Sequence, residues 1–140
     1  MGPLAIGAVS GLAGVKVPTI RYYEEIGLLP APQRTDTNRR TYDGATVRRL
    51  KFIRHARELG FEVDAIRTLL ELADQPARPC DEADVIARRH LGDIDDRIAR
   101  LTALRAEIQA MVDQCARGSI AQCRVIEVLA DHEECLSEAH

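Results

Sequence analysis

The stretch of residues 81–114 constrains the fold of this chain most, because it runs thirty-four residues without proline and with a single glycine, Gly92. Its apolar residues recur at steps of three and four, the spacing of a coiled-coil seam, and only Arg105 interrupts the series. The seam residues are Leu91, Ile94, Ile98, Leu101, Ile108, Val112 and Cys115. Asp81, followed by Asp84, indicates an N-cap with an acidic first turn. We therefore predict one long helix that pairs through this seam with another helix.

Cysteines stand at both ends of the predicted helix. Cys80 precedes it, Cys115 ends it, and Cys123 follows after a loop of seven residues. A helix rises about 1.5 Å per residue, so Cys80 and Cys115 of one chain lie about 50 Å apart and cannot share a ligand. If two copies pair antiparallel, Cys80 of one chain arrives beside Cys115 and Cys123 of the other. The spacing predicts a homodimer with two symmetric clusters of thiols.

Length and composition narrow the class of protein. A chain of 140 residues is one domain or two small ones. With 4% aromatic residues and no tryptophan, it suits packed helices better than an aromatic-rich β-sandwich. No apolar stretch approaches the length of a membrane-spanning helix, and residues 4–15 do not have the pattern of a signal peptide. Four cysteines without a secretory signal indicate a reducing, cytoplasmic environment.

Positive charge is concentrated in the first part of the chain. Residues 1–60 contain ten Lys and Arg against five Asp and Glu, whereas residues 61–140 contain nine against seventeen. A basic N-terminal part on a chain of net charge −3 favours nucleic acid as the partner of that part.

The basic part also has the pattern of a helix-turn-helix. Residues 6–13 have helical apolar spacing and end at Gly14, and Pro18 opens a second helix over residues 19–26. Arg21 in this second helix is a candidate for contact with a base edge or a phosphate. Three neighbours could donate hydroxyls to phosphates: Thr19, Tyr22 and Tyr23. One of the two tyrosines is expected to pack into the core instead.

The remaining segments alternate turns and helices. Residues 33–42, rich in arginine around an Asp-Thr-Asn turn, predict a small hairpin beside the helix-turn-helix. Further helices are predicted over residues 44–59, capped by Asp43, over 62–72 and over 124–130. The expected fold is all-α with a small β-hairpin wing. Its parts are a winged helix-turn-helix DNA-binding domain (1–75), a linker and antiparallel coiled-coil dimerisation helix (76–114), and a metal-binding loop with a short helix and tail (115–140).

In these residues the chain resembles the MerR family of transcriptional regulators, and the resemblance covers essentially all of it. The residues that carry it are Ile6-Gly7, Ala13-Gly14-Val15, Thr19-Ile20-Arg21-Tyr22-Tyr23-Glu24, Gly27-Leu28-Leu29, Asn38, Arg40, Tyr42 and residues 47–61. Arg39 departs from the family pattern, in which many members carry an aromatic residue, and it adds charge to the wing.

The resemblance implies a dimer that binds double-stranded promoter DNA, where RNA polymerase also binds. Members generally repress without ligand, and with ligand they distort the bound DNA so that polymerase can use the promoter. The DNA-contact residues expected on this basis are Lys16, Thr19, Arg21, Tyr22, Tyr23, Arg39, Arg40, Tyr42 and Arg54.

The effector implied by the resemblance is a metal ion. Little more than two dozen residues follow Cys115, too few for the large ligand-binding domain of drug-sensing members. Three thiolates, from Cys115, Cys123 and the partner's Cys80, make a soft site suited to cadmium, lead, mercury or zinc. The loop 115–123 most resembles the cadmium- and lead-responsive branch. Mercury stays open, and the absence of a histidine from this loop weakens zinc.

Three alternatives remain open. The same cysteines could sense oxidants or electrophiles, they could be inert in an architectural DNA binder, or the chain could be an enzyme. No nucleophile with a partnered base is visible for the last of these. A weaker second metal site in the tail would use His132, Cys135 and His140, although a disordered polar end is the simpler interpretation.

Overall fold

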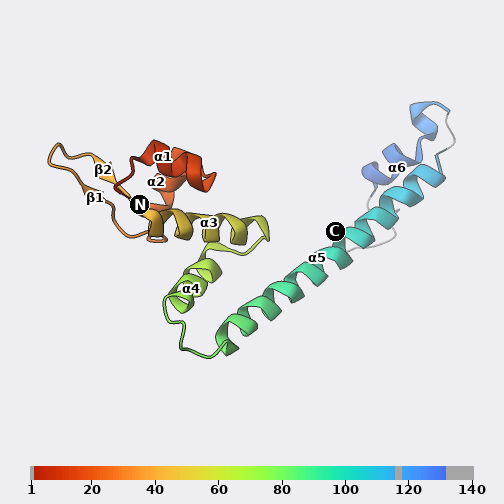
Figure 1. Cartoon of the computed structure of the whole chain (residues 1–140). Helices are drawn as coiled ribbons and strands as arrows, with labels where there is room; N and C mark the ends of the chain where they lie inside the picture. Colours follow the sequence, from red (N-terminus) through yellow and green to blue (C-terminus); the bar gives the residue numbers. More distant parts are fainter. Residues whose placement is uncertain (1, 116–117, 132–140) are drawn as a thin grey trace. The chain divides into compact units, whose positions relative to one another are not determined.

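The computed structural model describes residues 2–115 and 118–131 (Figure 1). The chain divides into two compact units, Met1–Asp84 and Val85–His140. The described residues form six α-helices, one 3-10 helix and one two-stranded hairpin, which confirms the predicted all-α class with a small β-hairpin. None of the helices in this described part is long and apolar enough to cross a membrane.

The first unit begins with two short helices, α1 (Ile6–Ala13) and α2 (Val17–Glu25), joined by a tight turn. Gly14 ends α1 in the left-handed conformation, with φ of 70°, and its N–H bonds to the Ser10 carbonyl at 2.9 Å. Pro18 lies in the first turn of α2, where the missing N–H has no helical partner to lose. These elements are the two helices of the predicted helix-turn-helix.

Replacing Gly14 by alanine should lower the free energy of unfolding by about 1–2 kcal/mol, the cost of a left-handed conformation for an L-residue. A Cβ at this position would also run into the Arg54 guanidinium. Urea denaturation measures the loss. Gly7→Ala is the matched control, because Gly7 lies inside α1 with nothing within 4 Å of an added Cβ. The control should gain stability from better helix propensity, and equal effects at the two positions would contradict the assignment.

The wing, residues 33–42, is an antiparallel hairpin of β1 (Gln33–Arg34) and β2 (Arg40–Thr41). Its register pairs Gln33 with Thr41 and Arg34 with Arg40. Asn38 in the turn has φ of 62°, a left-handed conformation that asparagine tolerates. At the base of the wing, the backbones of Leu4 and Tyr42 exchange two N–H to O bonds of 2.8 and 2.9 Å. The N-terminal segment therefore braces the wing.

Two longer helices, α3 (Gly44–Glu58) and α4 (Val63–Ala73), complete the first unit. The Asp43 carboxylate caps α3 as predicted, because it accepts the Thr46 N–H at 3.0 Å, and this bond lowers the pKa of Asp43. The largest fully buried side chains are Val9, Ile20, Leu28, Leu50, Ile53 and Ile66, so one core joins the helices of this unit.

Helix α5 (Asp81–Asp113) is the long helix predicted from the sequence, and its first residues end the first unit. The predicted N-cap was wrong by one residue. Asp81 is the first helical residue, and the carbonyl of Cys80 accepts the first bond, from the Asp84 N–H at 2.9 Å. The acidic first turn, formed by Asp81, Glu82 and Asp84, is as expected.

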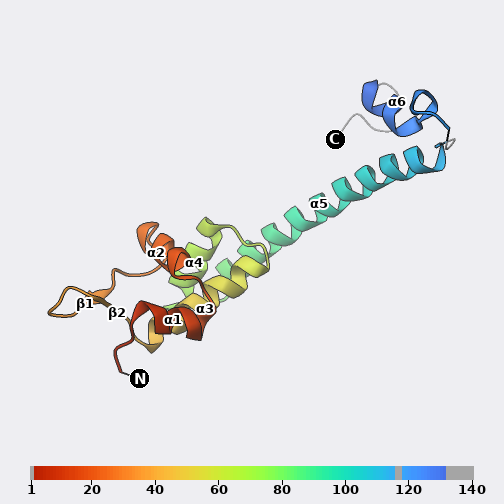
Figure 2. The ribbon, with the colours of Figure 1, turned by 90° about the horizontal axis from the view of Figure 1, so that it is seen from above.

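The second unit ends with η1 (Ile120–Gln122) and α6 (Arg124–Ala130). Helix α6 lies beside the C-terminal part of α5 in both views (Figures 1 and 2). Three side chains of these helices are buried: Glu107 and Met111 of α5 and Val128 of α6. The short last helix, predicted over the same residues, therefore belongs to a small core at this end of α5.

Candidate DNA interface and thiol cluster

Helix α2 and Lys16, the residue before it, expose several of the side chains predicted for DNA contact. Lys16, Arg21 and Tyr22 are exposed, Tyr22 by 50%, and Thr19 is half-buried. Tyr23 is buried, with 9% exposed, so one of the two tyrosines packs into the core as expected. Charged and hydroxyl-bearing side chains on the exposed face of a short helix can contact both base edges and phosphates.

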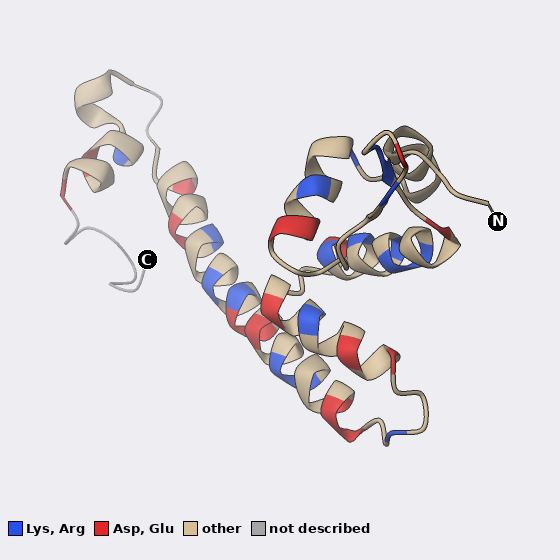
Figure 3. Ribbon diagram, turned by 90° about the vertical axis from the view of Figure 1, so that its left-hand side faces the viewer, with Lys and Arg blue, Asp and Glu red and all other residues tan. Residues whose placement is uncertain are grey.

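Helix α3 is densely basic (Figure 3). It carries Arg48, Arg49, Lys51, Arg54 and Arg57 against one acidic residue, Glu58. Three of these arginines donate to backbone carbonyls, and Arg57 bonds to the Phe61 carbonyl at 2.9 Å. Arg54 donates to the Ala13 carbonyl at 3.4 Å and pairs with Glu58 at 3.0 Å, and Arg49 donates to the Leu28 carbonyl at 2.8 Å. Arg54, predicted as a DNA contact, thus braces the turn after α1, and DNA contact by it stays a prediction.

The basic side chains of the wing differ in their surroundings. Arg39 is exposed, whereas Arg40 pairs with Glu24 of α2 at 3.1 Å. Tyr42 is buried, with 6% exposed, and its hydroxyl donates a short hydrogen bond to the other Glu24 oxygen. Burial first, and then the neighbouring Glu24 carboxylate, raises the pKa of Tyr42 to about 12. Sequence reasoning missed Glu24 as a site residue, because its partners lie in another element and no local pattern signals them.

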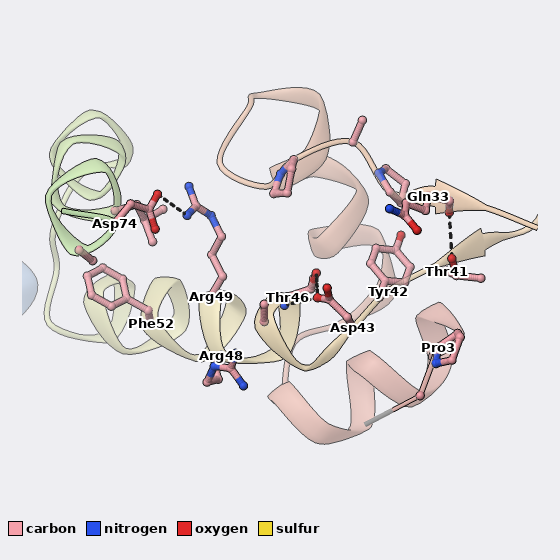
Figure 4. Close-up of a pocket in the computed structure, with 17 residues that line it drawn as sticks. Pro3, Gln33, Thr41, Tyr42, Asp43, Thr46, Arg48, Arg49, Phe52 and Asp74 are labelled. Carbon is pink, nitrogen blue, oxygen red and sulfur yellow. Dashed lines mark hydrogen bonds and ion pairs between the residues drawn. The ribbon is translucent and has the colours of Figure 1, made fainter. Parts of the chain in front are cut away.

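A cavity of about 810 Å³ lies in the first unit between the base of the wing, α3 and the end of α4 (Figure 4). Phe52 and Leu70 belong to its apolar lining, and the ion pair of Arg49 with Asp74, at 3.4 Å, lies along it. Of the predicted DNA contacts, only Tyr42 lines this cavity. The cavity and the exposed side chains of α2 are therefore different surfaces.

The segment between α5 and α6 brings two predicted thiol ligands together. Cys123 stands at the N-cap position of α6, and Cys115 follows α5. The Ile126 N–H is the largest cause of a lowered pKa at Cys123, and the Val125 N–H and the Cys115 thiol add to it, while burial opposes them. The Cys123 side chain forms no capping hydrogen bond with these N–H groups, so they lower its pKa through their proximity to the sulfur. The thiolate, which is the metal-binding form, is favoured at Cys123.

Two neighbouring thiols, one of which has a lowered pKa, suit a soft metal ion. Two sulfur donors alone do not complete a metal site. Within the described residues of one protomer, no group of three His, Cys, Asp or Glu side chains could hold an ion. Cys80 belongs to the other compact unit, where it is exposed. The proposed tail ligands, His132, Cys135 and His140, lie outside the described residues. A third ligand from the partner's Cys80 stays a prediction.

Cys123 should be alkylated by iodoacetamide with a pH midpoint below 9.0, the ordinary value for its thiol, because only the thiolate is nucleophilic. Mass spectrometry of the Cys123 peptide from reduced, metal-free protein gives the midpoint. Because the pKa of Cys123 is lower in the folded state, the thiolate stabilises the folded protein at pH values above the pKa of the unfolded thiol. This stabilisation is lost as the pH falls through the pKa of the folded thiol. Cys115→Ser should raise the midpoint only in part, because the Ile126 N–H remains. Equal midpoints in folded and urea-unfolded protein would contradict the assignment.

The predicted seam of α5 faces solvent in the protomer. Leu91, Ile98, Leu101, Ile108 and Val112 are 56% to 63% exposed, and Ile94 is 37% exposed. Large apolar side chains in a continuous row on one helix mark a surface that binds another protein surface. Their spacing at three and four residues favours a second helix as the partner.

Comparison with known proteins finds relatives over nearly the whole chain. The family described as "MerR HTH family regulatory protein" matches residues 4–73, and the one described as "MerR, DNA binding" matches residues 47–111. The chain is similar to "Heavy metal-dependent transcription regulator 2" of Rhizobium meliloti (strain 1021), with 33% identity over 90% of this chain and 86% of the relative. It is also similar to the "Mercuric resistance operon regulatory protein" of Serratia marcescens, with 36% identity over 94% of this chain and 90% of the relative.

A solved structure supports the same grouping. The chain resembles the transcription regulator PbrR691 from Ralstonia metallidurans CH34 in complex with lead(II), with a TM-score of 0.81 and 33% identity, over 90% of this chain and 98% of that one. The predicted winged helix-turn-helix fold is thereby confirmed. The matching proteins are transcription regulators, which removes the enzyme alternative. With a matching family over residues 4–73 and relatives at 33% and 36% identity over nine-tenths of its length or more, the chain belongs to the MerR family of helix-turn-helix regulatory proteins.

Proposed function

We propose that the chain is a metal-responsive transcriptional regulator that binds promoter DNA as a homodimer and takes a soft divalent ion through cysteine thiolates. The observation that carries the proposal is the closeness of two free thiols between α5 and α6, those of Cys115 and Cys123. The pKa of the Cys123 thiol is lowered. Relatives named for heavy metals and for mercuric resistance, and a similar regulator in complex with lead(II), support a metal as the effector.

For the ion itself we favour cadmium or lead, with mercury and zinc as further candidates. Thiolate sulfur is a soft donor and selects such ions over magnesium or calcium. The lead(II) complex of PbrR691 supports lead, and the name of the Serratia marcescens relative supports mercury. Cys115 and Cys123 would hold the ion together with the partner's Cys80, and the bound ion would neutralise these thiolates and link the two protomers.

The residues of this chain divide the regulatory work. Helix α2 presents Arg21 and Tyr22 to a DNA groove, and the wing presents Arg39 to the backbone. The seam of α5 joins two protomers, so that two recognition helices meet half-sites related by a twofold axis. RNA polymerase then meets a promoter whose shape the dimer controls, because bending and twisting DNA have energies that a bound protein can shift.

Arg21→Ala should weaken binding to the operator by about tenfold to a hundredfold, because the loss of one arginine contact costs about 1–3 kcal/mol. An operator fragment selected with the wild-type protein serves as the probe, and fluorescence anisotropy at fixed salt measures the affinity. Arg100→Ala is the matched control, since Arg100 is an exposed arginine of α5. Unchanged affinity in the Arg21 variant would refute the assignment of α2 as the recognition helix.

A thiol-based sensor of oxidants is the second candidate, because a reactive thiolate at Cys123 beside the Cys115 thiol also favours disulfide formation. Two thiols then lose two electrons and two protons to peroxide, which is reduced to water. This candidate predicts that peroxide changes operator binding without any metal. The metal proposal predicts a response of reduced, anaerobic protein to the ion alone, so one anaerobic titration separates them.

A further inference from the structure

Glu24 connects the recognition helix to the wing. It lies on α2 three residues after Arg21, and its side chain is only 9% exposed. One carboxylate oxygen accepts the Tyr42 hydroxyl, and the other pairs with Nη1 of Arg40 at 3.1 Å. Both partners belong to the wing, so one carboxylate ties two DNA-facing elements of the same unit together.

Tyr42 is held from a second direction as well. Its backbone exchanges bonds of 2.8 and 2.9 Å with Leu4, and the next residue, Asp43, caps α3 through the Thr46 N–H at 3.0 Å. A rotation of the wing that moved Tyr42 relative to α2 would therefore have to break both its bond to Glu24 and its backbone pairing with Leu4. The junction gives the wing one preferred angle.

Charge explains why Glu24 has two partners. A buried carboxylate without compensation is unfavourable, and a free carboxylate on a recognition helix would repel phosphates. Arg40 supplies the opposite charge, although its Nη1 lacks hydrogen-bond geometry toward Glu24 and therefore acts more through charge than through a directed bond. Tyr42 supplies the directed bond, and its raised pKa keeps the hydroxyl protonated as a donor.

Arg39 and Arg40 are neighbours with opposite surroundings. Arg40 is half-buried against Glu24, whereas Arg39 is exposed. Successive side chains of an extended chain point to opposite sides, so the orientation that brings Arg40 to Glu24 directs Arg39 away from α2.

We infer that Glu24, Arg40 and Tyr42 are positioning residues that set the angle of the wing on the recognition helix, and that Arg39 is the wing residue that neutralises a phosphate. The inference rests on the DNA binding proposed above. Of the three wing residues expected to contact DNA, Arg39 then makes the contact, and Arg40 and Tyr42 orient the wing.

The salt dependence of operator binding separates these roles, because each neutralised phosphate adds about 0.9 to the slope of log affinity against log salt. Arg39→Gln should reduce the slope by about 0.9. Arg40→Gln and Tyr42→Phe should weaken operator binding several-fold, keep the wild-type slope, and lower the ratio of operator affinity to random-sequence affinity.

Glu24→Gln should change the salt slope of operator binding, a quantity that would stay the same if Glu24 had only a structural role. The amide can still accept the Tyr42 hydroxyl, but it releases the Arg40 guanidinium to the DNA. The slope should therefore steepen by up to about 0.9, and the double variant Glu24→Gln with Arg40→Gln should return to the wild-type slope. A loss of stability alone changes none of these slopes.

Two results would overturn the inference: a slope reduced as much by Arg40→Gln as by Arg39→Gln, or a wild-type slope in Glu24→Gln. Circular dichroism confirms the fold of each variant, and Tyr42→Phe, which removes a single hydroxyl, keeps the test usable if an arginine variant does not fold. If Arg21→Ala and Arg39→Gln both leave operator binding unchanged, the proposed DNA interface fails and this inference with it. That pattern is distinct from the two results above.

Discussion

Ile98→Asp should convert the protein from a dimer to a monomer and abolish operator binding. Ile98 is 56% exposed in the protomer and lies midway along the seam of α5. In an antiparallel pair the two copies of this residue meet near the twofold axis, so two carboxylates would be desolvated beside each other. The effective penalty for burying a charge is several kcal/mol per ion, enough to dissociate a dimer at micromolar concentration. Sedimentation velocity and anisotropy measure the two effects.

Ala99→Asp is the matched control for this change. It adds the same charge at the next position of α5, which is also exposed but lies off the apolar row. The control should remain a dimer and bind the operator. A dimeric Ile98→Asp protein would show that the seam is not the dimer interface, and dissociation of both variants would point to destabilisation of α5 itself.

Cys80→Ser should lower the affinity for cadmium or lead by at least about a hundredfold. Four-ligand zinc sites are worth about 10–16 kcal/mol, so one ligand contributes about 3 kcal/mol. Anaerobic titration of reduced protein, followed by thiolate-to-metal charge-transfer absorbance, measures the affinity and ranks cadmium, lead, mercury and zinc. The variant should remain dimeric, because Cys80 is exposed and precedes the seam.

A heterodimer of Cys80→Ser with Cys115→Ser tests whether the ligands come from two chains. One end of that heterodimer keeps all three thiols, from Cys115 and Cys123 of one protomer and the partner's Cys80, so it should bind one ion while each parent homodimer binds none tightly. Two affinity tags isolate the mixed dimer. Failure of this complementation would exclude a shared site, and full affinity in the Cys80→Ser homodimer would exclude Cys80 as a ligand.

Local patterns predicted the elements of this fold well. The bounds of α1 and α6 follow from apolar spacing together with Gly14 and Cys123, which flank them. The Asp43 cap and the Asn38 turn likewise depend on residues close in sequence. The start of α5 was displaced by one residue because several acidic residues in succession can each serve as a cap, and only the bond to the Cys80 carbonyl decides among them.

The tertiary ties of the site could not be read from the sequence. Glu24 bonds to Tyr42, eighteen residues on, and Arg54 bonds to Ala13, forty-one residues back. No periodicity links such positions, and an arginine in a basic segment looks the same whether it faces DNA or the protein interior. Glu107 shows the same limit, because nothing in the local sequence of this charged helix signals burial of an acidic residue, yet it is 5% exposed. The closeness of Cys115 and Cys123, by contrast, follows from the short loop between them.

The position of Cys123 makes its sulfur part of the start of α6. This helix has only seven residues, so by itself it is marginal, and it depends on Val128 in the small core and on favourable groups at its first turn. A negative sulfur beside the N–H groups of Val125 and Ile126 is such a group. Protonation or alkylation of that sulfur should therefore destabilise α6. Unfolding of α6 should in turn raise the pKa of the Cys123 thiol. Amide hydrogen exchange along residues 124–130 would thus report the chemical state of one thiol.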